Sequence, residues 1–135
     1  MADFTHIAKS LTKRKTVIFT ALSKKNFFWN KHIIKWVLEK GYVPIGQYML
    51  FDYFLLETVD RNIIREANNN LVLKSDELWV FGEISDGVLV EIELYKTTGK
   101  IIRYFNISNL PDEIKEVSKE NAVFEDNLQV YANKL

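Results

Sequence analysis

The sequence predicts an α/β fold, a flavodoxin- or Rossmann-like three-layer sandwich built around a mainly parallel sheet of four strands. Residues 76–105 show the pattern strand, helix, strand within about thirty residues, which is typical of a βαβ unit with a right-handed crossover. Upstream, two short apolar runs rich in β-formers alternate with helical patterns. The expected strands are 16–20, 42–45, 77–82 and 100–105, and the handedness rule gives them the order 2-1-3-4.

The βαβ unit has clear internal boundaries. Residues 78–81 are apolar, too few for a helix and rich in aromatic and β-branched side chains, so they indicate a buried strand that Gly82 ends. A polar turn follows, and residues 88–98 have a helical pattern that Gly99 closes as a C-cap. In open parallel sheets, ligands bind beyond the carboxyl ends of the strands. The turn after residue 82 is therefore expected at a ligand-binding edge.

The first expected strand, 16–20, is β-branched and apolar, as a central parallel strand should be. The small, polar and basic residues after it stand at the same carboxyl edge, where a strand-to-helix connection can hold an anion. Ala21 and Ser23 are candidate ligand-binding residues there, together with Lys24 and Lys25. A solvated entry to the next helix is the alternative interpretation for the lysines.

The middle of the chain predicts a helix over residues 28–40, an edge strand and a second helix over 60–74. Pro44 makes a central position for the strand 42–45 unfavourable. Between strand and helix, residues 46–57 are dense in aromatic side chains whose helical spacing favours core or dimer packing. The functional alternative is a base-stacking wall carried by Tyr48 and Phe51.

The composition changes after residue 105. Pro111 is expected to begin a short acidic helix, and residues 121–135 an appended helix or arm. We therefore divide the chain into an N-terminal arm (1–15), an α/β domain (16–105) and a C-terminal helical extension (106–135) that packs on the same domain.

The composition argues against several classes of function. The chain has 135 residues with 18 basic and 18 acidic side chains, and this zero net charge argues against nucleic acid as the main partner. It has no cysteine and two histidines, so neither a disulfide framework nor a zinc site is expected. No run suits a membrane span or a signal peptide. We expect a cytoplasmic protein without a metal or cofactor.

The turn before the predicted helix 88–98 carries the chemistry. Ser85 or Asp86 can cap the helix, and Gly87 lets a ligand approach its first N–H groups, which suits a phosphate or carboxylate. Glu91, one turn further on, can project toward the same crevice. A carboxylate beside the anomeric carbon of a sugar can act as a nucleophile, and a second acid, Glu83 or Asp86, would protonate the leaving group. The alternative interpretation is a structural one, in which the turn caps the helix and Glu91 is an exposed glutamate outside any active site.

This pattern resembles the nucleoside 2-deoxyribosyltransferase superfamily, which includes deoxynucleoside 5'-monophosphate N-glycosidases. Residues 20–21 are similar to the family's first loop and residues 41–44 to its second strand, so the resemblance covers roughly residues 16–105. It implies that Glu91 is the glycosyl-accepting nucleophile, that Ser85 and Gly87 approach a phosphate or sugar hydroxyl, and that the protein is a homo-oligomer in which a neighbour completes the site. The matching residues are Asp76, Ser85, Asp86, Gly87, Glu91, Gly99 and Lys100.

The sequence also departs from the family pattern. Leu22 and Ser23 stand where the family usually has Gly and Pro, and Asn68 stands where it has a second carboxylate, although an amide cannot serve as a base. Residues 78–82 look closer to an uncharacterised bacterial and phage branch of the superfamily. The expected function is hydrolysis or 2-deoxyribosyl transfer at a nucleoside or nucleotide N-glycosidic bond. The alternative is a non-catalytic nucleotide-binding module with the same fold.

Overall fold

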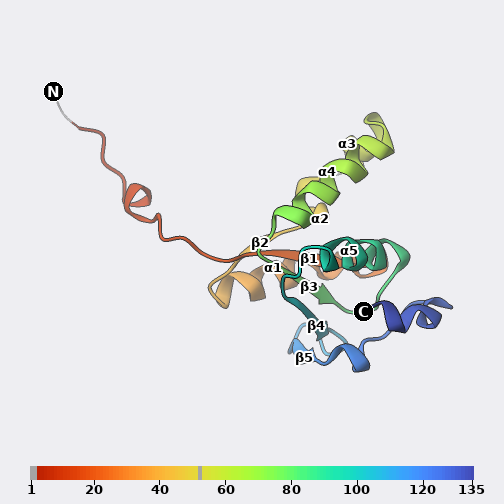
Figure 1. Cartoon of the computed structure of the whole chain (residues 1–135). Coiled ribbons are helices and arrows are strands. Elements are labelled where there is room, and N and C mark those ends of the chain that lie inside the picture. Colours follow the sequence, from red (N-terminus) through yellow and green to blue (C-terminus); the bar gives the residue numbers. More distant parts are fainter. Residues whose placement is uncertain (1–2, 52) are drawn as a thin grey trace.

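The computed structural model describes residues 3–51 and 53–135 and contains an α/β fold with a mostly parallel sheet (Figure 1). Its strand order is β2-β1-β3-β4-β5, in which the first four strands are parallel and β5 is antiparallel to β4. The α/β class is confirmed and the first four strands have the predicted order, but the predicted number of four strands is one too few. The strands are β1 (Val17–Leu22), β2 (Val43–Ile45), β3 (Glu77–Phe81), β4 (Ile102–Asn106) and β5 (Lys115–Val117).

Helices connect the parallel strands. Short 3-10 helices η1 (Ile7–Ser10), η2 (Lys24–Trp29), η3 (Lys119–Asn121) and η4 (Leu128–Lys134) lie in the N-terminal arm, after β1 and in the C-terminal extension. The α-helices are α1 (Asn30–Glu39), α2 (Gln47–Leu50), α3 (Tyr53–Thr58), α4 (Arg61–Lys74) and α5 (Asp86–Lys96).

A hydrophobic core lies on each face of the sheet. On one face α4 and α5 cover β1, β3 and β4, where Val72, Ile92 and Tyr95 are fully buried. On the other face Ile33, Trp36 and Val37 of α1 pack against the aromatic side chains Trp79, Phe81 and Phe105 of the sheet. Because both faces are covered, β1 and β3 are apolar along almost their whole length, as central parallel strands require.

Several predicted helices differ in their details. The helix expected from residue 28 begins as a regular α-helix at Asn30, because η2 precedes it. The aromatic segment 46–57 is split at Phe51 into α2 and α3. On α4 the buried stripe is Ile64, Asn68 and Val72, whereas the neighbouring Ile63 is 63% exposed. The stripe at i, i+4, i+8 therefore includes a polar residue.

The C-terminal extension is only partly helical, since it contains turns and a strand before its short 3-10 helices. The backbone N–H of Asp112 donates to the carbonyl of Asn109, so the residues after Pro111 form turns instead of an acidic helix. The chain then forms β5, because Val117 packs on the core beneath α5 while its neighbours pair with β4. The helices that follow, η3 and η4, are 3-10 rather than α.

Two parts of the chain stand away from the sheet. Figure 1 shows the N-terminal arm extending from β1, with α3 at the far end of α4. Phe4, Ile7 and Leu11 of the arm are each at least 73% exposed. Among the described residues, no helix is both long and apolar enough to cross a membrane.

The end of β2 shows why a glycine is needed beside the sheet. β2 is an edge strand, as Pro44 predicted, and Gly46 follows it in extended backbone. A Cβ atom at Gly46 would lie 2.6 Å from Thr20 Oγ1 and 3.2 Å from the Thr20 carbonyl oxygen. Because Thr20 is buried in β1, the side chain has little room to move away.

We expect Gly46→Ala to lower the free energy of unfolding by about 1–3 kcal/mol, since the added methyl overpacks a buried contact. The matched control is Gly87→Ala in the first turn of α5, where the nearest atom to the new Cβ is Ser85 Oγ at 4.0 Å. That variant should be neutral or more stable by up to about 1 kcal/mol. Urea unfolding of both variants measures the difference, and equal destabilisation would contradict the close-approach argument.

Candidate functional site

The loops after β1 and β3 meet at the carboxyl edge of the sheet. This is the point at which the strand order reverses, where α/β folds bind their ligands. Asn26 Nδ2 donates a hydrogen bond of 2.7 Å to Glu83 Oε2, and Lys25 Nζ lies 3.8 Å from Glu83 Oε1. Gly82, at φ +79°, permits this approach, because a Cβ there would lie 3.1 Å from Asn26 Nδ2. The two loops therefore form one surface.

Glu83 is held in its ionised form by that surface. Partial burial acts to raise its pKa, but the hydrogen bond from Asn26, a backbone hydrogen bond and the charge of Lys25 outweigh it. The pKa of Glu83 is consequently lower than usual. A group of this kind is a fixed negative charge at the edge of the sheet and a poor proton donor.

A segment of the C-terminal extension, residues 122–126, crosses the same edge, and we call it the strap. Ile84 N donates to the Val123 carbonyl at 2.8 Å, and Glu125 N donates to the Ile84 carbonyl at 3.0 Å. Ile84 and Phe124 thus form a parallel bridge. Ser23 Oγ, on the loop after β1, donates to the Glu125 carboxylate. The strap therefore joins the two loops and covers Ser23, whose side chain is only 2% exposed.

The N-terminus of α5 is capped by its own residues. Ser85 Oγ accepts a hydrogen bond from Val88 N at 3.3 Å, as the sequence predicted for Ser85 or Asp86. Asp86 Oδ1 accepts one from Gly87 N at 2.7 Å. Two of the N–H groups that were expected to meet a phosphate are therefore already bonded to side-chain oxygens.

Glu91 lies on the buried side of α5 and faces α4. Its side chain is 8% exposed, and its Oε2 accepts a hydrogen bond of 2.8 Å from Asn68 Nδ2. Asn68 is equally buried, at 6% exposed, and its Oδ1 has no hydrogen-bond partner. The resemblance noted in the sequence predicts a second carboxylate at the position of Asn68, and the structure puts this amide in direct contact with Glu91.

The burial of this pair changes the chemistry of Glu91. Loss of solvent raises its pKa to about 7, although the hydrogen bond from Asn68 works in the opposite direction. When Glu91 is protonated, its hydroxyl can donate to Asn68 Oδ1, and the acid and the amide then satisfy each other. When Glu91 is ionised, Asn68 Oδ1 is left without a donor. Such a perturbed carboxyl is a functional-site candidate on physical grounds.

The structure does not bring together all the residues that the sequence singled out. Asp86 is exposed and lies roughly 140° around α5 from the buried Glu91, given 3.6 residues per turn. Ala21 is a core residue of β1. Tyr48 lies with its ring 5.3 Å from that of Phe27, against the core on the α1 face, opposite the α4–α5 face.

Phe51 is half-buried just after α2. The described contacts therefore place neither aromatic candidate beside Glu91. Asn26 and Glu125 are the residues that sequence reasoning missed. Asn26 follows the predicted anion-binding loop by one residue, so the same strand-end argument could have included it. Glu125 lies 102 residues from Ser23, and its one local signal is the small apolar run before it.

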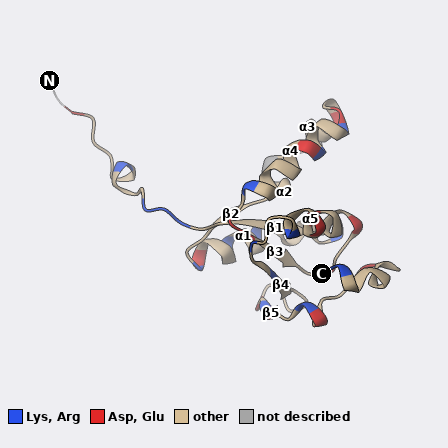
Figure 2. Ribbon diagram, viewed as in Figure 1, with Lys and Arg blue, Asp and Glu red and all other residues tan. Residues whose placement is uncertain are grey.

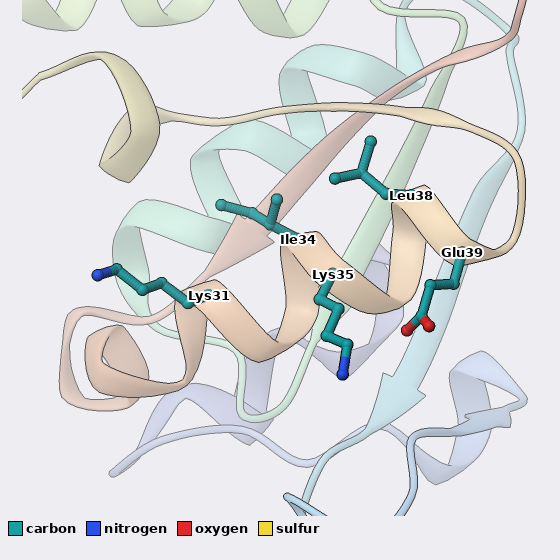
Figure 3. Close-up of a pocket in the computed structure, with 5 residues that line it drawn as sticks. All are labelled: Lys31, Ile34, Lys35, Leu38 and Glu39. Atoms are coloured by element: carbon teal, nitrogen blue, oxygen red, sulfur yellow. The ribbon is translucent and has the colours of Figure 1, made fainter.

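Surface hollows occur away from this edge. A hollow of about 360 Å³ lies on the outer side of α1 and is lined by Ile34 and Leu38 with three charged side chains (Figure 3). A second one, lined by Arg14, Lys15, Thr16 and Asp76, lies at the opposite edge of the sheet. Figure 2 shows the basic residues that end the arm just before β1. Within residues 3–51 and 53–135, no cluster of three His, Cys, Asp or Glu side chains could hold a metal ion.

Comparison with known proteins gives a family without an assigned activity. A family model described as a domain of unknown function (DUF7768) matches residues 18–105, about two thirds of the chain. No curated protein matches the chain. The matched range begins in β1 and ends in β4, so it includes Asn68 and Glu91 but neither the arm nor the strap.

We expect the wild-type chain to lose stability as the pH rises from about 4.5 to above 7, because folding keeps the proton on Glu91 that the unfolded chain releases. The loss attributable to Glu91 is roughly 3 kcal/mol. In Glu91→Gln this component disappears, and the new amide can donate to Asn68 Oδ1. Urea unfolding of the wild type and Glu91→Gln at pH 5 and pH 8 measures this pH-dependent component of the stability. Glu93→Gln is the exposed control on the same helix. Equal pH dependence in wild type and Glu91→Gln would disprove the assignment.

Proposed function

The chain belongs to the DUF7768 family of domains of unknown function, and we propose that it acts on the N-glycosidic bond of a nucleoside or nucleotide, by hydrolysis or by 2-deoxyribosyl transfer. The observation that carries this proposal is the buried Glu91–Asn68 pair. A carboxylate in this position lowers stability at neutral pH, and groups retained at such a cost cluster at functional sites. The resemblance of residues 16–105 to the nucleoside 2-deoxyribosyltransferases supplies the reaction class.

In the proposed mechanism the ionised Glu91 attacks the anomeric carbon of the sugar and the base departs. Asn68 holds Oε2 of Glu91, which leaves Oε1 as the attacking atom. The leaving base takes its proton from water, because Asp86, the acid that the sequence suggested, is exposed and lies on another side of α5 from Glu91. Water or a second base then attacks the same carbon and releases the carboxylate. The ligand would lie at the carboxyl edge, close to Ser85 and Gly87.

We expect base release from nucleosides or their 5'-monophosphates to be abolished in Glu91→Gln, since an amide is not a nucleophile here. Because only the carboxylate attacks, kcat/KM should rise about tenfold per pH unit below pH 7 and level off above it. Chromatography of free base, with and without an acceptor base, measures both quantities. Glu93→Gln should keep wild-type turnover, because Glu93 is exposed and pairs with Lys134 at 3.7 Å. Retained turnover in Glu91→Gln would refute the mechanism.

A second candidate is a nucleotide-binding module without catalysis. Asn68 favours it, because the position that the resemblance assigns to a second carboxylate holds an amide that cannot accept a proton as a base. This candidate predicts ligand binding by thermal shift with no base release. The non-catalytic candidate also predicts that Glu91→Gln changes the stability of the protein but not its affinity for the ligand.

We also propose that the sheet is a variant of the flavodoxin-like three-layer arrangement and that the chain forms a homo-oligomer. The four parallel strands in the order β2-β1-β3-β4, with helices on both faces, support the first point. The second is supported by large apolar side chains on the projecting helices, where Phe54 is 69% and Ile63 is 63% exposed.

A further inference from the structure

Three of the hydrogen-bond donors that could meet a phosphate at the carboxyl edge are already bonded within the chain. The hydroxyl of Ser23 donates to Glu125. The backbone N–H groups of Gly87 and Val88 donate to Asp86 and Ser85. An oxyanion of a ligand would have to displace an oxygen of the protein at each position.

The strap that brings Glu125 to this edge is held in place by hydrogen bonds and by packing. It makes two backbone hydrogen bonds with Ile84, of 2.8 and 3.0 Å, and Ala122 and Phe124 pack against the core beneath α5. The chain beyond it is fastened to α5, where Lys96 Nζ donates to the Lys134 carbonyl at 2.6 Å. Displacement of Glu125 would therefore break packing as well as hydrogen bonds.

The charges at this edge are unfavourable for an anion. Three carboxylates stand at this edge, Glu83 after β3, Asp86 at the start of α5 and Glu125 on the strap, against the two lysines after β1. One of these, Lys25, is paired with Glu83. Glu125 itself is half-buried and so remains accessible from outside, whereas Ser23 beneath it is not. A ligand that approaches the strap thus meets the Glu125 carboxylate before it meets the Ser23 hydroxyl.

Resting on the proposed function, we propose that Glu125 is a specificity-determining residue that restricts the site to uncharged nucleosides and excludes their 5'-monophosphates. A sugar hydroxyl is a donor, and carboxylates such as Glu125 and Asp86 are acceptors only. A phosphate carries up to two negative charges at pH 7 and presents acceptors to the same groups. The strap that supplies Glu125 lies outside the family match, so this selection belongs to the chain's own extension.

The test compares Kd values for the four common 2'-deoxynucleosides and their 5'-monophosphates on the full chain by calorimetry. In the wild type we expect the nucleoside to bind at least tenfold more tightly. Glu125→Gln keeps an acceptor for Ser23 and removes the charge, so the monophosphate should gain about tenfold while the nucleoside is unchanged. Because the effect is electrostatic, the wild-type preference should shrink toward that of the variant in 1 M salt, which a purely structural role would not produce.

Glu120→Gln on η3 is the matched control, since it removes the same charge from an exposed position and should leave the ratio of Kd values at the wild-type level. A wild type that binds monophosphates as tightly as nucleosides, or a Glu125→Gln ratio equal to that of the wild type, overturns this inference and leaves the proposed function standing. Absence of binding by every ligand to every variant overturns the proposed function, and this inference with it.

Discussion

The parallel pairing of β1 with β3 is the constraint on which the rest of the molecule depends. Five residue pairs, from Ile18 with Glu77 to Leu22 with Phe81, hold the two strands side by side. The chain leaves β1 toward β2 and leaves β3 toward β4, so right-handed crossovers place α1 on one face and α4 and α5 on the other. The same pairing brings the two strand ends together and sets the loops that carry Ser23 and Glu83 in contact.

The candidate chemistry sits where α4 and α5, the two helices of one face, touch. Glu91 and Asn68 interrupt an otherwise apolar contact, and a matched hydrophobic pair would be expected to hold the helices at least as well. The neutral acid is the form that the surrounding protein favours, whereas the proposed attack requires the ion. Fold stability and reactivity therefore make opposite demands on one carboxyl group. That conflict gives the pair a functional interpretation in addition to its structural one.

The sequence predicted the parts of the fold that depend on local patterns. Apolar runs located β1 and β3, and Pro44 placed β2 at the edge. Gly99 put the end of α5 two residues too far along the chain, because the helix ends at Lys96 with Thr97 as its C-cap. β5 was missed because Lys-Glu-Val has no strand pattern of its own and is ordered by β4. Asn68 could have been assigned to the buried stripe from its spacing with Ile64 and Val72. Glu125 could not, because only the folded strap brings it to Ser23.

The edge strand β2 bears on how copies of this chain can associate. Val43 N donates inward to the Thr16 carbonyl, so alternation along the strand turns the nitrogen of Pro44 outward. That nitrogen carries no hydrogen, and a strand arriving from another molecule would find the central donor missing. At the other end of the sheet, β5 is three residues long and includes Lys115 and Glu116. Both borders thus resist continuation of the sheet, which protects the chain from edge-to-edge aggregation and leaves helical surfaces for assembly.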